Sequence, residues 1–427
     1  MKSRLPLFFL LLISACTSME NAELTTRATF IKTYSGIRGI EAAAAELTPD
    51  GFIVLGNMTI TRDSVLTVVF KTDKRGNRTT PIQYFPGGSG NAIKALPDNQ
   101  GYLVVGERIK VNPQDPETSN IDIYEARMLH VNNNLDVVNN FYRADVSGQA
   151  IITDYKAVTL TITPDEKIVV LGSYQGALNT PERPYIEIFD ANLTSETFTE
   201  YAALERSYKN AKSIHHLNEN LIWASAIALE QQNFDFSYAS VPVVKEGSVF
   251  TRYTSIGENT PLSQSLRVDD IQPFKFQGLG FGVVGTRSNP NGTNANIIFF
   301  RTDSQGNIRE TTVNYFDAIS GETTETTSSI QDYGTAITGT SDGGFVIAGH
   351  YVTNTQQGNG LNDIVLIKVD LNGNLIWMKT FGGTGSETVS TIRETDDYGL
   401  LVCGTNVIGG VPSIFLIKTD ANGELKN

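Results

Sequence analysis

A short phrase returns seven times along the chain: a turn, an apolar run and a small residue, most often glycine. The final residues of successive copies lie 50, 66, 53, 60, 64 and 55 positions apart. A period of this length in strand-forming residues is typical of a radial or stacked β repeat. The copies are DGFIVLG (50–56), NQGYLVVG (99–106), DEKIVVLG (165–172), NENLIWAS (218–225), QGLGFGVVG (277–285), DGGFVIAG (342–349) and DYGLLVCG (397–404).

A second phrase follows each copy of the first and closes on a polar turn. In VVFKTDKRGN (68–77) and IFLIKTDANGE (414–424), an apolar run ends in an Asp that is followed three residues later by Gly. Glycine permits the positive φ that tight antiparallel turns need. A shorter strand with an aromatic residue near its end comes next, and the stretch before the following repeat supplies one more. Each unit therefore predicts four antiparallel strands, a to d, with the two phrases as b and c.

The repeats are offset at the two ends of the chain. Seven copies of strand c are present, but the chain stops just after the last, so that unit lacks its own strand d. The segment FIKTYSGIRGIE (30–41) reads like WMKTFGGTGSE (377–387) and supplies the missing strand. Closing a ring in this way removes exposed sheet edges. We therefore expect an all-β fold, a seven-bladed β-propeller of four-stranded antiparallel blades closed by the N-terminal strand; a linear β-solenoid is the alternative.

The first fifteen residues have the features of an export signal. Lys2 and Arg4 precede an apolar run that is too short to span a bilayer, and Ile13-Ser14-Ala15-Cys16 follows it. This tetrad resembles the lipobox of bacterial lipoprotein signal peptides. The resemblance implies cleavage before Cys16 and acylation of that cysteine. An ordinary signal peptide with an incidental cysteine is the alternative.

These features divide the chain into a signal peptide (1–15), a lipid-anchored tether (16–28) and a single β-propeller domain (29–427). Two or three acyl chains would anchor the protein stably in a membrane. Thr17 stands where some inner-membrane lipoproteins have aspartate, so the resemblance implies an outer-membrane lipoprotein. Whether it faces the periplasm or the cell surface is left open.

Charge and motif content narrow the classes of partner. Without the signal peptide, 31 basic and 46 acidic side chains remain, a formal charge of −15, which argues against binding to nucleic acid. No two of the four histidines have a metal-ligand spacing, so no metal is predicted. The string DLNGN (370–374) resembles part of a calcium loop but lacks the closing glutamate and repeats as a hairpin turn, so structural calcium is left open. The string GFGVVG (280–285) matches a dinucleotide fingerprint but lies within a strand with no helix after it, so no cofactor is predicted.

Loop lengths distinguish the two faces of the predicted ring. The a–b and c–d turns are short and share one face, here called the short-turn face. The b–c and d–a loops share the other, the long-loop face, where binding is expected because long irregular loops gather there. The N-terminal strand must start on the short-turn face, so the long-loop face should point away from the membrane. Its long loops are 107–126, 143–155, 254–268, 286–296, 317–332 and 350–363.

Strand a of each blade is expected to line a central channel. Aligning the repeats by their turns places one polar or aromatic residue of each strand a near the channel mouth on the long-loop face. A ring of this kind can bind a small polar ligand, or it can be a set of mutually compensating solvated groups. With two residues of a neighbouring b–c loop, the candidate ligand-binding set is Glu41, Asn91, Tyr155, Lys209, Arg267, Asp332, Glu387, His350 and Tyr351. No residue is assigned a catalytic role.

The two phrases, as they stand in Thr340–Gly349 and Ile414–Gly423, resemble those of bacterial propeller lipoproteins and secreted proteins with kelch-like or PQQ-enzyme-like repeats. The resemblance implies the fold, whereas propellers host scaffolds, sugar binders and enzymes alike. We expect a lipid-anchored binding or scaffold module that presents its long-loop face to a glycan, peptide or protein. The alternative is a carbohydrate-active enzyme, a hydrolase or lyase, with a carboxylate site at the channel mouth.

Overall fold

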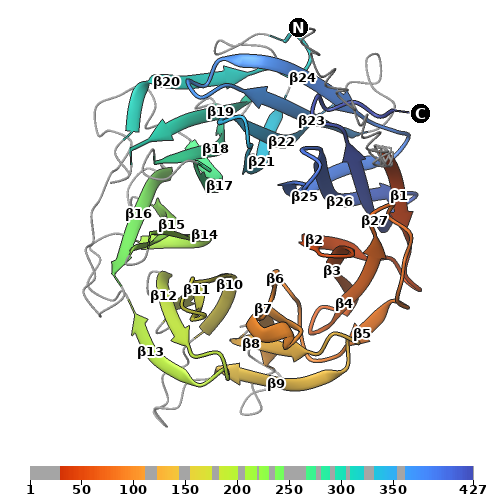
Figure 1. The fold of residues 1–427 in the computed structure, drawn as a ribbon, viewed down its shortest axis with the longest axis vertical. Helices are drawn as coiled ribbons and strands as arrows, with labels where there is room; N and C mark the ends of the chain where they lie inside the picture. The colour runs from red at the N-terminus through yellow and green to blue at the C-terminus, as the bar shows by residue number, and fades with distance from the viewer. Residues whose placement is uncertain are drawn as a thin grey trace, which may run out of the picture.

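The computed structural model describes residues 29–110, 123–143, 154–175, 182–200, 207–218, 221–229, 236–244, 266–275, 280–288, 294–303, 308–321, 331–352 and 361–426. Within these residues the chain forms seven antiparallel sheets and no α-helix. The sheets are arranged as blades around a central opening (Figure 1). The predicted seven-bladed β-propeller is therefore confirmed. No helix among the described residues is long and apolar enough to cross a bilayer.

The first four blades follow the predicted a-to-d order from the centre outward. Blade 1 comprises β2 (Glu41–Thr48), β3 (Gly51–Thr61), β4 (Ser64–Asp73) and β5 (Gln83–Phe85). Blade 2 comprises β6 (Ala92–Ala95), β7 (Tyr102–Lys110), β8 (Ile123–Val131) and β9 (Val137–Arg143). Blade 3 comprises β10 (Asp154–Ile162), β11 (Ile168–Gln175), β12 (Arg183–Phe189) and β13 (Ser195–Glu200). Blade 4 comprises β14 (Ser207–Asn218), β15 (Leu221–Leu229) and β16 (Phe236–Val244), and its expected outer strand near Tyr253 lies outside the described residues.

The remaining blades repeat the pattern. Blade 5 comprises β17 (Leu266–Pro273), β18 (Phe281–Ser288), β19 (Ala295–Thr302) and β20 (Ile308–Phe316). Blade 6 comprises β21 (Asp332–Gly339), β22 (Phe345–Val352), β23 (Asn362–Val369) and β24 (Leu375–Phe381). Blade 7 comprises β25 (Ser386–Glu394), β26 (Leu400–Ile408), β27 (Val411–Thr419) and, as its outer strand, β1 (Phe30–Tyr34).

The ring closes where the two ends of the chain meet. Strand β1 pairs with β27 from Phe30 opposite Lys418 to Tyr34 opposite Ile414, and the two lie side by side in Figure 1. Tyr34 is 7% exposed, and its hydroxyl donates a hydrogen bond to the Gly76 carbonyl oxygen at 2.5 Å, in blade 1. Strand β1 begins beside the end of β27, so the chain enters the ring from the short-turn face.

The middle strands of each blade are buried because both faces of a blade pack against neighbouring blades. In β3 and β26 the first six residues are all buried, which explains why strand b reads as a continuous apolar run. The c–d turns have the predicted chemistry. Asp370 Oδ1 accepts hydrogen bonds from the backbone N–H groups of Asn372 and Asn374, and Gly373 has a φ of 86°.

The inner strands share a bulge that the repeat pattern does not reveal. In each of five inner strands, one residue has no partner on strand b. A bulge of this kind bends the strand and re-aims a side chain. The unpaired residues are Ala43, Val158, Asp269, Thr335 and Ser390. All five line the central opening.

Removing the buried side chain that seals the ring should destabilise the whole domain. Truncating Tyr34 to Ala removes a buried ring, and large-to-small core changes of this kind cost about 3–5 kcal/mol of unfolding free energy. Ile31→Ala is the matched control, because Ile31 lies in the same strand but is 54% exposed. Urea unfolding followed by tryptophan fluorescence measures both. Equal midpoints for the two variants would contradict the sealing role of β1.

Candidate functional site

A cavity of about 450 Å³ lies at the centre of the ring. All seven inner strands contribute to its wall. The small residues Ala42, Ala44 and Ala92 line it, as expected where strands crowd together. Its polar side chains fall into two tiers, because each inner strand runs from the long-loop face toward the short-turn face.

The upper tier consists of the bulge residues and of Asn91, which directly precedes β6, and it lies nearer the long-loop face. It presents the hydroxyl groups of Thr335 and Ser390, the Asp269 carboxylate and the Asn91 amide. Asp269 forms an ion pair with Arg267 at 2.9 Å. Asn91 Nδ2 donates hydrogen bonds to Glu107 Oε2 at 2.5 Å and to the Ala157 carbonyl oxygen at 3.0 Å, and so joins blades 2 and 3.

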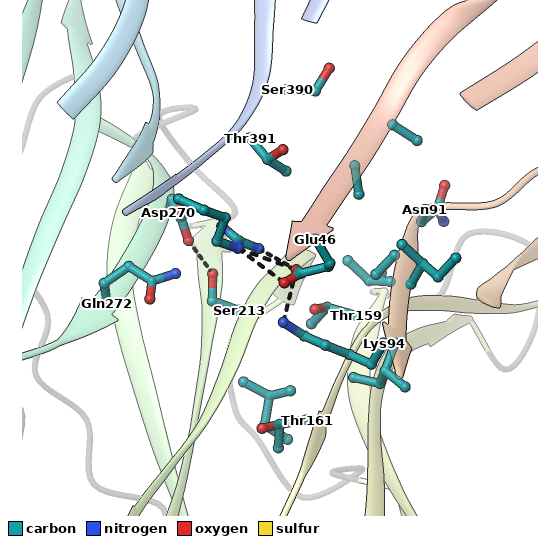
Figure 2. Close-up of a pocket in the computed structure, with 18 of the residues that line it drawn as sticks. Glu46, Asn91, Lys94, Thr159, Thr161, Ser213, Asp270, Gln272, Ser390 and Thr391 are labelled. Atoms are coloured by element: carbon teal, nitrogen blue, oxygen red, sulfur yellow. Dashed lines mark hydrogen bonds and ion pairs between the residues drawn. The ribbon is translucent and has the colours of Figure 1, made fainter. Parts of the chain in front are cut away.

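The lower tier centres on the carboxylate of Glu46. Glu46 Oε1 lies 2.6 Å from Arg393 Nη2 and 2.8 Å from Lys94 Nζ, so one carboxylate links the inner strands of blades 7, 1 and 2. Figure 2 shows Glu46 and Lys94 meeting within the cavity. Burial by itself would raise the pKa of Glu46, but Arg393 and Lys94 lower it to about 2. Glu46 is therefore ionised at neutral pH.

A second carboxylate links the opposite side of the ring. Asp270 Oδ1 accepts a hydrogen bond from the Ser213 hydroxyl at 2.6 Å, and Oδ2 accepts one from the Ile337 N–H at 3.1 Å. These contacts connect blades 4, 5 and 6, and Figure 2 shows the Ser213 contact. Burial raises the pKa of Asp270. The hydrogen bonds from Ser213, from the Ile337 N–H and from the Ile271 N–H, together with the charge of Arg393, oppose that effect.

Two polar atoms beside this cavity have no hydrogen-bond partner in the protein. They are the Thr335 hydroxyl oxygen and the His215 Nε2, and both residues line the wall. Burial, followed by the charge of Lys94, lowers the pKa of His215 to about 3, so its imidazole is neutral at physiological pH. Buried polar groups normally have partners, and those that do not often mark a place where water or a ligand binds.

Six of the seven residues expected at the channel mouth lie within the first three residues of an inner strand, and Asn91 directly precedes one. Of these, Asn91 lines the cavity. Glu41 is exposed, and the Lys209 side chain lies outside the described residues. Tyr155 is buried among aromatic rings, and its hydroxyl donates to Glu200 Oε1 at 2.6 Å. A ligand-binding role for these residues stays a prediction.

Arg267, His350 and Tyr333 form a small stack between blades 5 and 6. The His350 imidazole stacks on the Tyr333 ring with centroids 5.1 Å apart and the ring planes inclined by 26°. The Arg267 guanidinium lies 5.9 Å from the Tyr333 ring centre. Burial, together with the charge of Arg267, lowers the pKa of His350 to about 4. A neutral imidazole with an unpartnered Nδ1 results.

Asp332, Tyr351 and Asp363 lie opposite one another in three adjacent strands of blade 6, so their side chains share one face of the sheet. Asp332 is fully buried, and neither of its carboxyl oxygens has a hydrogen-bond partner. The nearby Ala318 N–H lowers the pKa of Asp332, but by less than burial raises it. Burial, reinforced by the charge of Asp317, raises the pKa of Asp332 to about 7. Tyr351, expected to lie on an exposed loop, is only 7% exposed.

Sequence reasoning missed most of the cavity wall. Thr335, Ser390 and Asp269 follow the aligned positions by two or three residues, and they reach the cavity because of the bulge. One feature of the sequence could have revealed the bulge. Strand a is one residue longer than the segment of strand b with which it pairs. Glu46 and Arg393 gave no signal, since single charged residues near a turn are usually solvated.

Comparison with known proteins supports the fold and gives no family. No family model and no curated protein matches the sequence. The structure resembles a polysaccharide lyase described as a PL25 ulvan lyase bound to -[GlcA(1-4)Rha3S]-, with a TM-score of 0.56 and 10% identity over 93% of this chain and 98% of that one. It also resembles the polysaccharide lyase Uly1, with a TM-score of 0.54 and 9% identity over 95% of this chain and 94% of that one. At such identity the likeness shows the propeller fold alone.

Replacing Asp332 by Asn should remove a pH dependence of stability. Because its folded-state pKa is raised from 3.8 to about 7, the stabilisation from the bound proton is full below about pH 4 and is lost as the pH rises through 7. The full shift corresponds to at most ~4 kcal/mol. Asp332→Asn should therefore unfold at a higher urea concentration than the wild type at pH 8, with a smaller difference at pH 4. Asp396→Asn, an exposed carboxyl in blade 7, is the control, and a pH-independent difference for Asp332→Asn would contradict the assignment.

Proposed function

We propose that this protein is a glycan-binding β-propeller, anchored by lipid to the outer membrane, which holds part of a saccharide in its central cavity. The observation that carries the proposal is the chemistry of the cavity wall. It offers hydroxyl, amide, imidazole and ionised groups from all seven inner strands, and two of its polar atoms have no partner in the protein.

The size and chemistry of the cavity fit a short stretch of saccharide. Its volume of about 450 Å³ lies within the range of small-ligand sites. Sugar hydroxyl groups both donate and accept hydrogen bonds, so they can satisfy the Thr335 hydroxyl and the neutral His215 imidazole together. The two similar structures are polysaccharide lyases, one with a saccharide bound, which supports a glycan as the partner.

The position of the charged lower tier supports entry of the saccharide into the cavity from the long-loop face. Glu46 draws Arg393 and Lys94 together on the side of the cavity nearer the short-turn face. The upper tier leaves its hydroxyl groups toward the long-loop face. Anchoring through Cys16 would place the short-turn face toward the bilayer, because β1 enters the ring from that side. The long-loop face, with the upper tier of the cavity, would then point toward extracellular or periplasmic glycans.

Thr335→Val tests the role of the cavity, because the change keeps the side-chain shape and removes a hydroxyl that has no partner in the protein. With the purified mature protein, isothermal titration against a panel of neutral and uronate-containing oligosaccharides should identify a ligand. For that ligand, Thr335→Val should weaken binding about 3- to 10-fold, the worth of one hydrogen bond. Thr388→Val, in β25 and outside the cavity wall, should bind like the wild type. Equal affinities for wild type and Thr335→Val, or no ligand in the panel, would contradict the proposal.

A carbohydrate-active enzyme is the second candidate, and one observation favours it. Asp332 has a pKa near 7, which suits a general acid or base. However, its side chain is fully buried in blade 6, away from the cavity wall, so a substrate cannot contact it in this conformation. The same titration distinguishes the candidates. Oligosaccharide recovered intact supports binding, and shortened chains that disappear with Asp332→Asn support catalysis.

Lipid anchoring at Cys16 makes a separate prediction. Cys16→Ser should prevent acylation, and the protein should move from the membrane fraction to the soluble fraction of the exporting cell. Metabolic labelling with a palmitate analogue, followed by fractionation, measures both effects. Cys403→Ser is the matched control, because Cys403 is buried in blade 7 and cannot carry a lipid. Unchanged labelling of Cys16→Ser would exclude the anchor.

A further inference from the structure

The boundary between blades 6 and 7 contains buried acceptor oxygens with no donors. Asp363 Oδ1, Glu387 Oε2 and Asn406 Oδ1 each lack a hydrogen-bond partner. Asp363 and Glu387 are only 6% and 5% exposed. No ion pair involves either carboxylate in the part of the chain that the structure describes. Asp363 accepts a hydrogen bond from the Tyr351 hydroxyl, and Glu387 accepts one from the Gly383 N–H, so each carboxyl is only partly satisfied. The buried acceptor oxygens that remain without a donor are costly, and they indicate a group that is held there in solution.

These side chains converge on one short loop between β24 and β25. A methyl group at Gly382 would lie 2.2 Å from Asp363 Oδ1, and one at Gly385 would lie 1.9 Å from Asn406 Oδ1 and 3.1 Å from Glu387 Oε1. Glu387 and Asn406 are also direct partners across β25 and β26. The loop 382–385 therefore lies against two carboxylates and an amide oxygen. Any larger side chain at Gly382 or Gly385 would push these oxygens apart.

The carboxylates also affect one another electrostatically. Burial raises the pKa of Glu387, and the charge of Asp363 raises it further. Burial likewise raises the pKa of Asp363. A cation would satisfy the unpartnered oxygens of Asp363, Glu387 and Asn406 together, because all three are acceptors.

We propose that Asp363, Glu387 and Asn406 bind a calcium ion at the loop 382–385 on the long-loop face. Calcium prefers oxygen ligands, accepts mixed carboxylate, amide and backbone carbonyl sets, and tolerates irregular geometry. In the described residues no three His, Cys, Asp or Glu side chains gather as a metal site by themselves. Backbone carbonyl oxygens and water would complete the coordination of the ion. This site is separate from the cavity and does not depend on glycan binding.

Calcium titration of the metal-stripped mature protein tests the proposal. Isothermal calorimetry with CaCl₂ should show saturable binding of one ion per chain, and the unfolding temperature should rise with Ca²⁺ and fall with EDTA. Mg²⁺ should bind more weakly, because it requires a tighter octahedral geometry. Asp363→Asn and Glu387→Gln should each reduce Ca²⁺ affinity at least about tenfold. Asp396→Asn, an exposed carboxyl in the same blade as Glu387 but on the short-turn face, should leave the affinity unchanged.

The wild-type measurement decides the outcome even if the variants fail to fold. An absence of saturable Ca²⁺ binding, together with an unfolding temperature that Ca²⁺ and EDTA do not change, would overturn the site. In that case stability that falls as the pH rises would identify a shared proton in its place. An equal loss of affinity in Asp396→Asn would also overturn the assignment, because it would show non-specific binding to surface carboxylates.

Discussion

The pairing of β1 with β27 is the contact on which the rest of the structure depends. Each blade buries both faces of its middle strands against its neighbours, so an open ring would expose apolar strand faces at its two ends. Without β1, blade 7 would have an unpaired outer strand and Tyr34 would leave the interface with blade 1. Closure also fixes the direction in which the chain enters the ring, and hence which face points away from the proposed lipid anchor.

Polar contacts join the inner strands in addition to apolar packing, in which Ala336 of β21 and Ile392 of β25 share one buried cluster. Glu46 joins blades 7, 1 and 2, Asn91 joins blades 2 and 3, and Asp270 joins blades 4, 5 and 6. Buried ion pairs add little net stability, because desolvation offsets the attraction. Their consequence here is geometric: they hold the wall of the cavity in one arrangement, so a ligand would meet groups that are already in place.

The limits of prediction from sequence are clearest at the inner strands. The repeat alignment placed Glu41, Asp332 and Glu387 near the channel mouth, and in the structure they lie at the beginnings of inner strands. It could not show that Asp332 and Glu387 would be buried between strands and loops rather than face the channel. A single bulge residue reverses the alternation of side chains in a strand, and so Thr335 and Ser390 form the wall instead. The ion pairs of Glu46 join residues about 50 and 350 positions apart, and no local pattern reports such contacts.

The sequence alone determined the class of fold, the number of blades, the order of strands within a blade and the closure of the ring. These features follow from local rules that repeat seven times: apolar runs where strands are buried on both faces, and Asp and Gly where turns need positive φ. Only the tertiary structure decided which side chains share the cavity and which buried oxygens lack partners. Those properties depend on how seven blades approach one axis, and there a one-residue bulge or a single glycine loop determines where a side chain points.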